Sequence, residues 1–225
     1  MNTEKHYLER LLDPADRDMI EKEEHFSQVM MMYSCAIREV QTKLEVLNDD
    51  LTTRYQRNPI HNIKSRIKTP MSIAKKLEKK GLPVCVDSIR DNLNDVAGVR
   101  VICSFVDDIY TIAEMLTSQT DITLIRQKDY IEHPKKNGYR SLHLIIEIPV
   151  FFADMMRPMR VEVQIRTIAM DYWASLDHQL RYKKDNMDPN YLREMETRLK
   201  KCADTITETD MEMLDIRKNI YGYRI

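Results

Sequence analysis

Residues 161–167 alternate between apolar and polar side chains, and this alternation constrains the fold more than any other stretch. The segment reads Val-Glu-Val-Gln-Ile-Arg-Thr, so Glu162, Gln164 and Arg166 share one side of a strand. Such a strand needs a sheet with one buried face and one polar face. The polar side is either an ordinary solvated surface or part of a site, and this segment alone leaves both interpretations open.

Helical and strand patterns alternate along the chain between two long helical segments. Residues 18–57 contain neither Gly nor Pro, and Asn58-Pro59 ends the helical pattern. Further helices are predicted at about 70–80, 107–116, 168–182 and 188–221, and strands at 99–106, 123–131, 141–150 and 160–167, with an extended stretch around 66–68. The prediction is an α+β fold, with a mixed sheet of about five strands flanked by helices.

Glycine is scarce, which excludes a glycine-rich phosphate loop. The four glycines are Gly81, Gly98, Gly138 and Gly222, too few and too far apart for a P-loop or a dinucleotide-binding fingerprint. A bound nucleotide would therefore have its phosphates held by cationic side chains.

Charge and hydropathy favour a cytoplasmic globular protein. The net charge is −1, no run of about 18 apolar residues occurs, and the first residues lack the apolar core of a signal peptide. The lack of an apolar run predicts no membrane association. The cysteines have no metal-ligand spacing and no secretion signal accompanies them, so we expect reduced thiols.

A cationic cluster stands out in this nearly neutral chain. Residues 61–80 carry seven Lys or Arg and one Glu. Arg66 and Lys68 lie two apart in an extended stretch, and Ser72 and Lys76 lie four apart on the following helix, so each pair shares a side. Arg100 would join from the next strand. The cluster is either a solvated basic surface or a site for a compact polyanion such as a triphosphate.

Asp95 and Glu162 are the candidate metal ligands. Mg²⁺ is commonly held by one or two carboxylates together with substrate phosphates. Asp95 precedes one predicted strand and Glu162 lies in another, so the fold could bring them together. Otherwise Asp95 caps a turn and Glu162 is a surface residue.

An aromatic side chain follows the turn signal Asn137-Gly138. Tyr139 on the rim of this turn could stack on a purine, which is worth roughly 1–3 kcal/mol, or could simply begin a strand. Lys135 and His143 flank it on either side, and His143 could equally be a half-buried histidine with its hydrogen bonds satisfied.

Four blocks in this order resemble the synthetase domain of the RelA/SpoT-homologue family. They are residues 66–76, 95–101, 136–143 and 161–167, and the run 173–183 is similar to stand-alone small alarmone synthetases of the RelQ type. The resemblance covers roughly residues 62–183. It implies a nucleotidyltransferase-like synthetase core at 61–184, an N-terminal helical extension at 1–60 and a C-terminal oligomerisation helix at 185–225.

The resemblance implies transfer of pyrophosphate from ATP to the ribose 3′-hydroxyl of GDP or GTP, giving ppGpp or pppGpp and AMP. It assigns the ATP phosphates to Arg66, Lys68, Ser72, Lys76 and Arg100, and Mg²⁺ to Asp95 and Glu162, with Glu162 also the base. It assigns the acceptor nucleotide to Lys135, Asn137, Tyr139, His143, Gln164 and Arg166, with Tyr139 as the guanine platform. Gln164 and Arg166 would orient the ribose and phosphates or only brace the strand.

The alternative is a non-catalytic protein that binds guanine nucleotides or single-stranded RNA in the same cationic groove. The Asp95 and Glu162 pair argues against it, because a pure binder needs no metal carboxylates. An unrelated nucleotidyltransferase would leave the aromatic turn unexplained. No His-Asp dipeptide occurs, so we expect no companion hydrolase activity.

The resembled small synthetases are tetramers built through their terminal helices. We therefore expect a homotetramer, with apolar surface supplied by Met30, Tyr33, Ile37 and Leu44.

Those synthetases can also bind pppGpp between subunits. Counting from the motifs places Asn62, Asp171 and a position near Glu45 where that pocket has an aromatic ring, an asparagine and a lysine. The added negative charge would repel the effector, so we expect weak or absent activation by the product.

Overall fold

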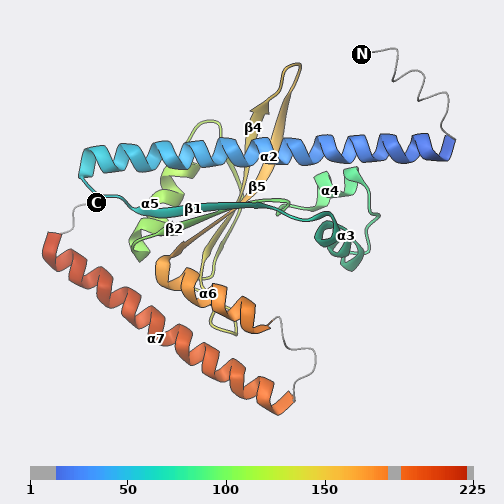
Figure 1. Ribbon diagram of the computed structural model, residues 1–225. Helices are drawn as coiled ribbons and strands as arrows, with labels where there is room; N and C mark the ends of the chain where they lie inside the picture. Colours follow the sequence, from blue (N-terminus) through green and yellow to red (C-terminus); the bar gives the residue numbers. More distant parts are fainter. Residues whose placement is uncertain (1–13, 182–188, 222–225) are drawn as a thin grey trace.

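A five-stranded mixed sheet forms the centre of the computed structural model, which describes residues 14–181 and 189–221 (Figure 1). The strands are β1 (Ile60–Ile67), β2 (Ala97–Cys103), β3 (Thr123–Asp129), β4 (Leu142–Phe151) and β5 (Met156–Thr167). Their order is β1-β2-β5-β4-β3; β2 and β5 run parallel, and the other neighbours run antiparallel. The predicted α+β class with about five strands is confirmed.

Helices cover one face of this sheet and also lie at both ends of its strands. They are α2 (Pro14–Tyr55), α3 (Pro70–Lys79), α4 (Val86–Asn92), α5 (Val106–Thr117), α6 (Ile168–Arg181) and α7 (Pro189–Tyr221). The long helix α2 runs across the strands and packs with α5 on the same face (Figure 1). Helix α6 continues directly from β5 and packs against α7.

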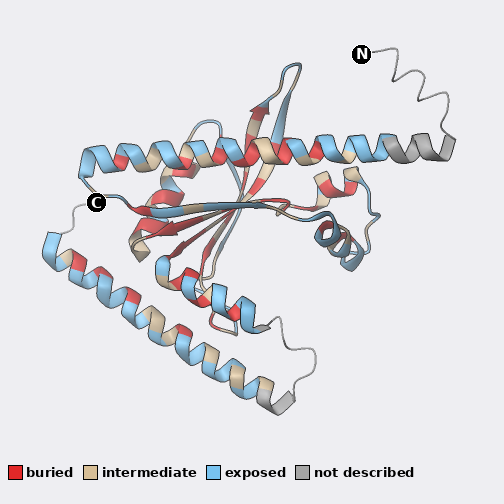
Figure 2. Ribbon diagram, in the orientation of Figure 1, coloured by how far each residue is buried: buried red, intermediate tan, exposed pale blue. Residues whose placement is uncertain are grey.

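Alternation along the strands separates the core from a polar face. Val161, Val163 and Ile165 on β5 are fully buried, while the residues between them are half-buried or face other polar groups. The same pattern occurs on β4, where every second residue from 142 to 150 is buried. Figure 2 shows the buried residues on the strands and on the side of α2 that faces them. Each fully buried aliphatic side chain contributes about 1.5–3 kcal/mol to folding.

Helix α2 supplies its apolar stripe to the core of its own chain. Tyr33, Ile37 and Leu44 are buried against the sheet, and Met30 is partly buried beside them. The expectation that Tyr33, Ile37 and Leu44 provide uncovered surface for other subunits is therefore wrong, because the core of their own chain already buries them.

Most predicted elements are present with boundaries shifted by a few residues. Helix α3 begins at Pro70, and the Thr69 hydroxyl caps it by accepting from the Ser72 amide at 3.3 Å. The extended stretch around 66–68 is the end of an eight-residue strand, and α4 was not predicted. The proposed boundary at 184/185 and residues 182–183 of the last block lie outside the described residues.

The four cysteines are free thiols, as expected. Within the described residues, none of the helices is both long enough and apolar enough to cross a membrane.

Candidate functional site

The face of the sheet away from α2 gathers polar side chains from all five strands. Paired residues on neighbouring strands point to the same side, so the strand register determines the members of this face. They are Lys64 and Arg66 on β1, Arg100 on β2, Glu162 and Gln164 on β5, His143 on β4, and Arg126 and Lys128 on β3. The predicted alternation on β5 is confirmed, because Gln164 Nε2 donates to Glu162 Oε2 at 2.9 Å and Arg166 Nη2 donates to Gln164 Oε1 at 2.8 Å.

The two predicted metal carboxylates line one cavity. Lys68 and Lys76 both donate to Asp95 Oδ2, the latter at 2.5 Å. Burial alone would raise the pKa of Asp95, but these two ammonium groups hold it below its usual value. Burial would likewise raise the pKa of Glu162, and contacts with His143 and Gln164 hold it below its usual value. Both carboxyl groups are therefore ionised at neutral pH.

Two cavities meet at Glu162. The first, here the β1–β2 cavity, measures about 240 Å³ and is lined by Lys64, Ser65, Arg66, Gly98, Val99, Arg100, Glu162 and Gln164. The second, here the central cavity, measures about 400 Å³ and is lined by Lys76, Lys80, Asn92, Asn94, Asp95, Arg126, Lys128, Tyr130, Lys135, His143, Ile145 and Glu162. Lys and Arg outnumber carboxylates in both linings, and the Glu162 carboxylate lines both spaces.

An aromatic cluster stands at the far side of the central cavity. The Tyr139 hydroxyl lies 2.8 Å from His143 Nε2 and accepts a hydrogen bond from Arg166 Nη2 at 3.0 Å. The Tyr130 ring meets the Tyr139 ring edge-on, with centroids 6.1 Å apart. The Lys135 ammonium lies 4.5 Å from the centroids of both tyrosine rings. The arrangement offers an aromatic platform with a cation beside it.

A third cavity opens on the other side of this cluster. This loop cavity measures about 520 Å³ and is lined by Lys135, Lys136, Asn137, Tyr139, Asp177 and Glu196. Asn137 Nδ2 donates to Asp177 Oδ2 at 3.3 Å, which ties the loop to α6. Lys135 lines both this cavity and the central one, so the loop cavity adjoins the central cavity at this side chain.

Asp171 collects three cations beneath the polar face. Its carboxylate accepts from Lys64 Nζ at 3.4 Å, Arg100 Nη1 at 3.3 Å and Arg166 Nη1 at 3.4 Å. Asp171 is buried, and Arg166 is only 2% exposed. We expected the negative charge of Asp171 to repel a bound effector. Because these three cations compensate that charge, Asp171 no longer supports the expected repulsion.

The predicted ATP residues divide between two places. Arg66 and Arg100 line the β1–β2 cavity, whereas Lys76 lines the central cavity and Lys68 reaches it through Asp95. Ser72 is exposed at the start of α3, where its hydroxyl accepts from Thr69 at 2.9 Å.

The predicted acceptor residues surround the aromatic cluster. Lys135, Asn137 and Tyr139 line the loop cavity, and His143 lines the central cavity. Gln164 is instead on the β1–β2 side, and Arg166 is a buried link between Tyr139, Gln164 and Asp171.

Several residues of this face were missed by sequence reasoning. The alternation that selected Arg66 and Lys68 extends back to Lys64, and the same alternation marks Arg126 and Lys128 on β3. Those signals were available in the sequence. The counterion role of Asp171 had no signal, because it depends on where α6 begins relative to three strands.

The residues present fit a magnesium ion bound together with substrate phosphates. Asp95 and Glu162 both line the central cavity, and the buried Asp95 Oδ1 has no hydrogen-bond partner among the described residues. No cluster of three or more His, Cys, Asp or Glu suited to a metal occurs in the described part of the chain. Two carboxylates with the remaining positions filled by phosphate and water are the ligand set that Mg²⁺ favours.

Known proteins share both this sequence and this fold. Residues 65–187 match the region found in RelA and SpoT proteins. GTP pyrophosphokinase YwaC from Bacillus subtilis is 40% identical over 88% of this chain and 92% of that protein, and GTP pyrophosphokinase YjbM from the same organism is 32% identical over 88% and 91%. The crystal structure of small alarmone synthetase 1 from B. subtilis, bound to its product pppGpp, matches with a TM-score of 0.78 at 32% identity, covering 88% of this chain and 98% of that chain. The chain belongs to the RelA/SpoT family, and its fold is that of the small alarmone synthetases.

Proposed function

We propose that the chain is a GTP pyrophosphokinase, which transfers a pyrophosphoryl group from ATP to the ribose 3′-hydroxyl of GDP or GTP. The products are AMP and ppGpp or pppGpp. The observation that carries the proposal is the position of Glu162, which lines both the β1–β2 cavity and the central cavity. A base that removes a proton from one substrate so that it attacks another must stand between the two.

ATP binds on the β1–β2 side. Arg66 and Arg100 line that side, and Lys68 and Lys76 stand around Asp95 at the central cavity, so the triphosphate extends past Glu162 toward them. These cations neutralise the charge that develops as AMP departs. The Ser72 hydroxyl and the first amides of α3 add hydrogen-bond donors at the edge of this site.

The guanine nucleotide binds on the opposite side of Glu162. Its base stacks on Tyr139 in the loop cavity, and its ribose and phosphates extend into the central cavity, where Lys135 and His143 lie. This orientation places the 3′-hydroxyl near Glu162. The Glu162 carboxylate accepts the hydroxyl proton, the oxygen forms a bond to the β-phosphorus of ATP, and the bond from that phosphorus to AMP breaks.

Magnesium supplies further charge neutralisation when it is bound, and Asp95 and Glu162 would hold it. Gln164 and Arg166 act as positioning residues, because they orient Glu162 and Tyr139 through the hydrogen bonds described above.

The direct test is product analysis. The protein is incubated with ATP and GDP or GTP, with and without Mg²⁺, and the nucleotides are separated by anion-exchange chromatography. We expect equimolar AMP and guanosine tetra- or pentaphosphate only in the presence of Mg²⁺. Release of ADP, or of inorganic pyrophosphate from ATP without a new guanosine product, would contradict the reaction, and binding without turnover would favour a regulatory nucleotide-binding protein.

We also propose that the chain does not hydrolyse its product. The purified protein incubated with ppGpp and Mg²⁺ or Mn²⁺ should leave it intact, and formation of GDP with pyrophosphate would refute this.

A further inference from the structure

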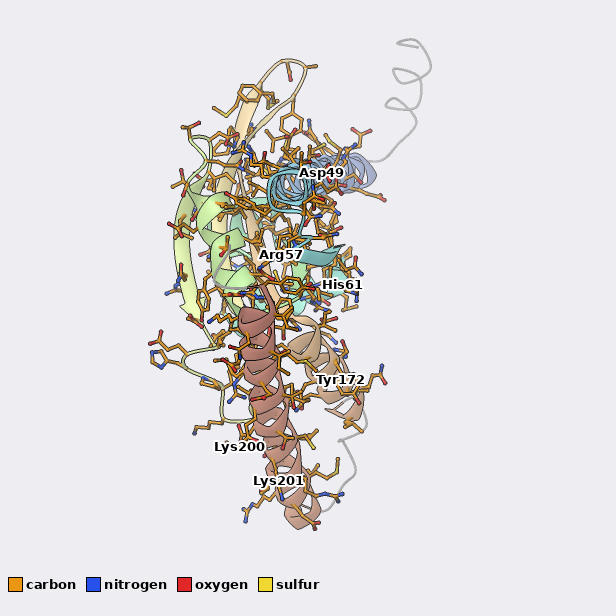
Figure 3. The ribbon with its side chains drawn as sticks, turned by 90° about the vertical axis from the view of Figure 1, so that its left-hand side faces the viewer. Asp49, Arg57, His61, Tyr172, Lys200 and Lys201 are labelled. Atoms are coloured by element: carbon orange, nitrogen blue, oxygen red, sulfur yellow. The ribbon has the colours of Figure 1, made fainter. Side chains whose placement is uncertain are left out.

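The loop that carries Tyr139 is pressed against the C-terminal helix. Gly138 has φ +88°, and a Cβ added there would lie 2.6 Å from Ala203 Cβ and 3.5 Å from Lys200 Cα on α7. Figure 3 shows the loop between β3 and β4 beside α7, close to Lys200. Backbone conformation and space both favour glycine at this contact, so the loop backbone packs directly against the helix.

One guanidinium group joins the loop to the helix. Arg140 Nη1 donates to the Gly138 carbonyl at 3.2 Å, and Arg140 Nη2 donates to Asp204 Oδ1 on α7 at 3.2 Å. The Arg140 side chain is 14% exposed, so this bridge is shielded from competing water at one end. Charge-assisted hydrogen bonds of this kind are stronger than neutral ones.

Helix α7 is itself fastened to the body of the molecule. Trp173 Nε1 donates to the Leu199 carbonyl at 3.0 Å, and Thr167 Oγ1 donates to Asp210 Oδ2 at 2.5 Å. These bonds connect α7 to α6 and to the end of β5, the strand that carries Glu162. The helix is therefore a fixed support for the loop.

The loop is closed by its own backbone hydrogen bonds. The Gly138 amide donates to the Lys135 carbonyl at 2.8 Å, and the Lys135 amide donates to the Tyr139 carbonyl at 3.2 Å. A shift of Gly138 would consequently displace Lys135 and Tyr139 together.

We propose that α7 positions the acceptor nucleotide, with Asp204 acting through Arg140 and Gly138 to hold the loop that presents Tyr139. Asp204 and Arg140 are positioning residues, and neither is among the residues that line the β1–β2 cavity. Loss of the bridge therefore affects use of the guanine nucleotide and spares use of ATP. This inference rests on the proposed function, which assigns the guanine base to Tyr139.

Steady-state kinetics on a double-mutant cycle test the bridge. The variants are Asp204→Asn, Arg140→Gln and the double variant, with Glu208→Gln as the control because Glu208 is exposed on the same helix. We expect each single variant to raise the KM for GDP about fivefold, the effect of losing one partly exposed charge-assisted bond, with the KM for ATP nearly unchanged. The KM for GDP in the double variant should be no higher than in the more impaired of the two single variants, since both substitutions remove the same link. An unchanged KM for GDP in both single variants, or an equal rise in the KM for ATP, would overturn the proposal.

Amide hydrogen exchange tests the same link without turnover. In the nucleotide-free protein, amides of residues 135–141 should exchange several-fold faster in Asp204→Asn and Arg140→Gln than in the wild type and the Glu208→Gln control. Unchanged exchange would mean that the helix does not hold the loop. If the wild type makes no alarmone, the proposed function fails, yet the exchange result still decides whether α7 supports the loop.

Discussion

At the scale of single residues, Glu162 is the group whose charge the proposed reaction needs most. Glu162→Gln keeps the shape of the side chain and removes both the base and a magnesium ligand. We expect kcat to fall at least about 100-fold, the lower end of what a positioned base contributes. Dissociation constants for GDP, measured by calorimetry, should change little. Near-normal turnover in this variant would eliminate Glu162 as the base.

Two variants of Tyr139 distinguish the contribution of base stacking from that of its hydrogen bonds. Tyr139→Ala should raise the KM for GDP far more than that for ATP, because loss of a stacked base costs roughly 1–3 kcal/mol. Tyr139→Phe keeps the ring and loses the contacts with His143 and Arg166, so its effect on GDP should be smaller. A rise in the KM for ATP as large as that for GDP would show that the ring is not the acceptor platform.

His143 should set the acidic limit of activity. The pKa of Glu162 is held below its usual value despite burial, and His143 supplies the largest lowering contribution, from a ring nitrogen 3.4 Å away. The base is therefore ionised above this lowered pKa, and activity is lost as pH falls through it. In His143→Ala the burial remains and the compensating contact is gone, so the pKa of Glu162 rises and the acidic limb of kcat/KM should move to higher pH.

His25→Ala is the control for this pH profile. His25 is exposed on α2, so its removal should leave the acidic limb of kcat/KM unchanged. If the acidic limb of kcat/KM in His143→Ala is unchanged, or moves to lower pH, His143 does not lower the pKa of the catalytic base.

At the scale of elements, α2 stabilises the sheet through its buried stripe. Leu44 is fully buried, so Leu44→Ala should lower the free energy of unfolding by about 2–5 kcal/mol, while Met31→Ala, at a position 44% exposed, should change it by about 0.5 kcal/mol or less. Urea denaturation followed by circular dichroism measures both. Equal changes in the free energy of unfolding for the two variants would mean that the buried stripe of α2 does not stabilise the sheet.

The sequence predicted the elements whose pattern is local and left out what depends on long-range placement. Alternation identified β5 and the shared side of Glu162 and Gln164, because the period of a strand is a property of consecutive residues. Helix α4 spans seven residues, too short for a helical period to emerge. Asp171 gains its role only when α6 starts beside β1, β2 and β5, and Arg140 only when α7 returns to the loop. Neither of these long-range contacts can be predicted from a local sequence pattern.

At the scale of the whole molecule, the burial of Tyr33, Ile37 and Leu44 leaves other surfaces to form the predicted tetramer. The outer side of α7 offers one, since Met213, Ile216 and Ile220 are 54%, 43% and 65% exposed at helical spacing. Contiguous exposed apolar side chains of this kind are typical of contacts between protein chains.

Light scattering at micromolar concentration should give four times the chain mass of 26.7 kDa. Ile216→Lys should produce a smaller species, because a lysine placed in the interface would bury an unpaired charge, whereas Glu208→Lys, away from this stripe, should keep the tetramer. A monomeric wild type would refute the oligomer. A tetramer that survives Ile216→Lys would move the interface to another exposed surface, of which the stripe Ile168, Tyr172, Leu176 and Leu180 on α6 is the next to test. Because α6 also carries Asp171 and Asp177, an interface there would couple assembly directly to the polar face of the sheet.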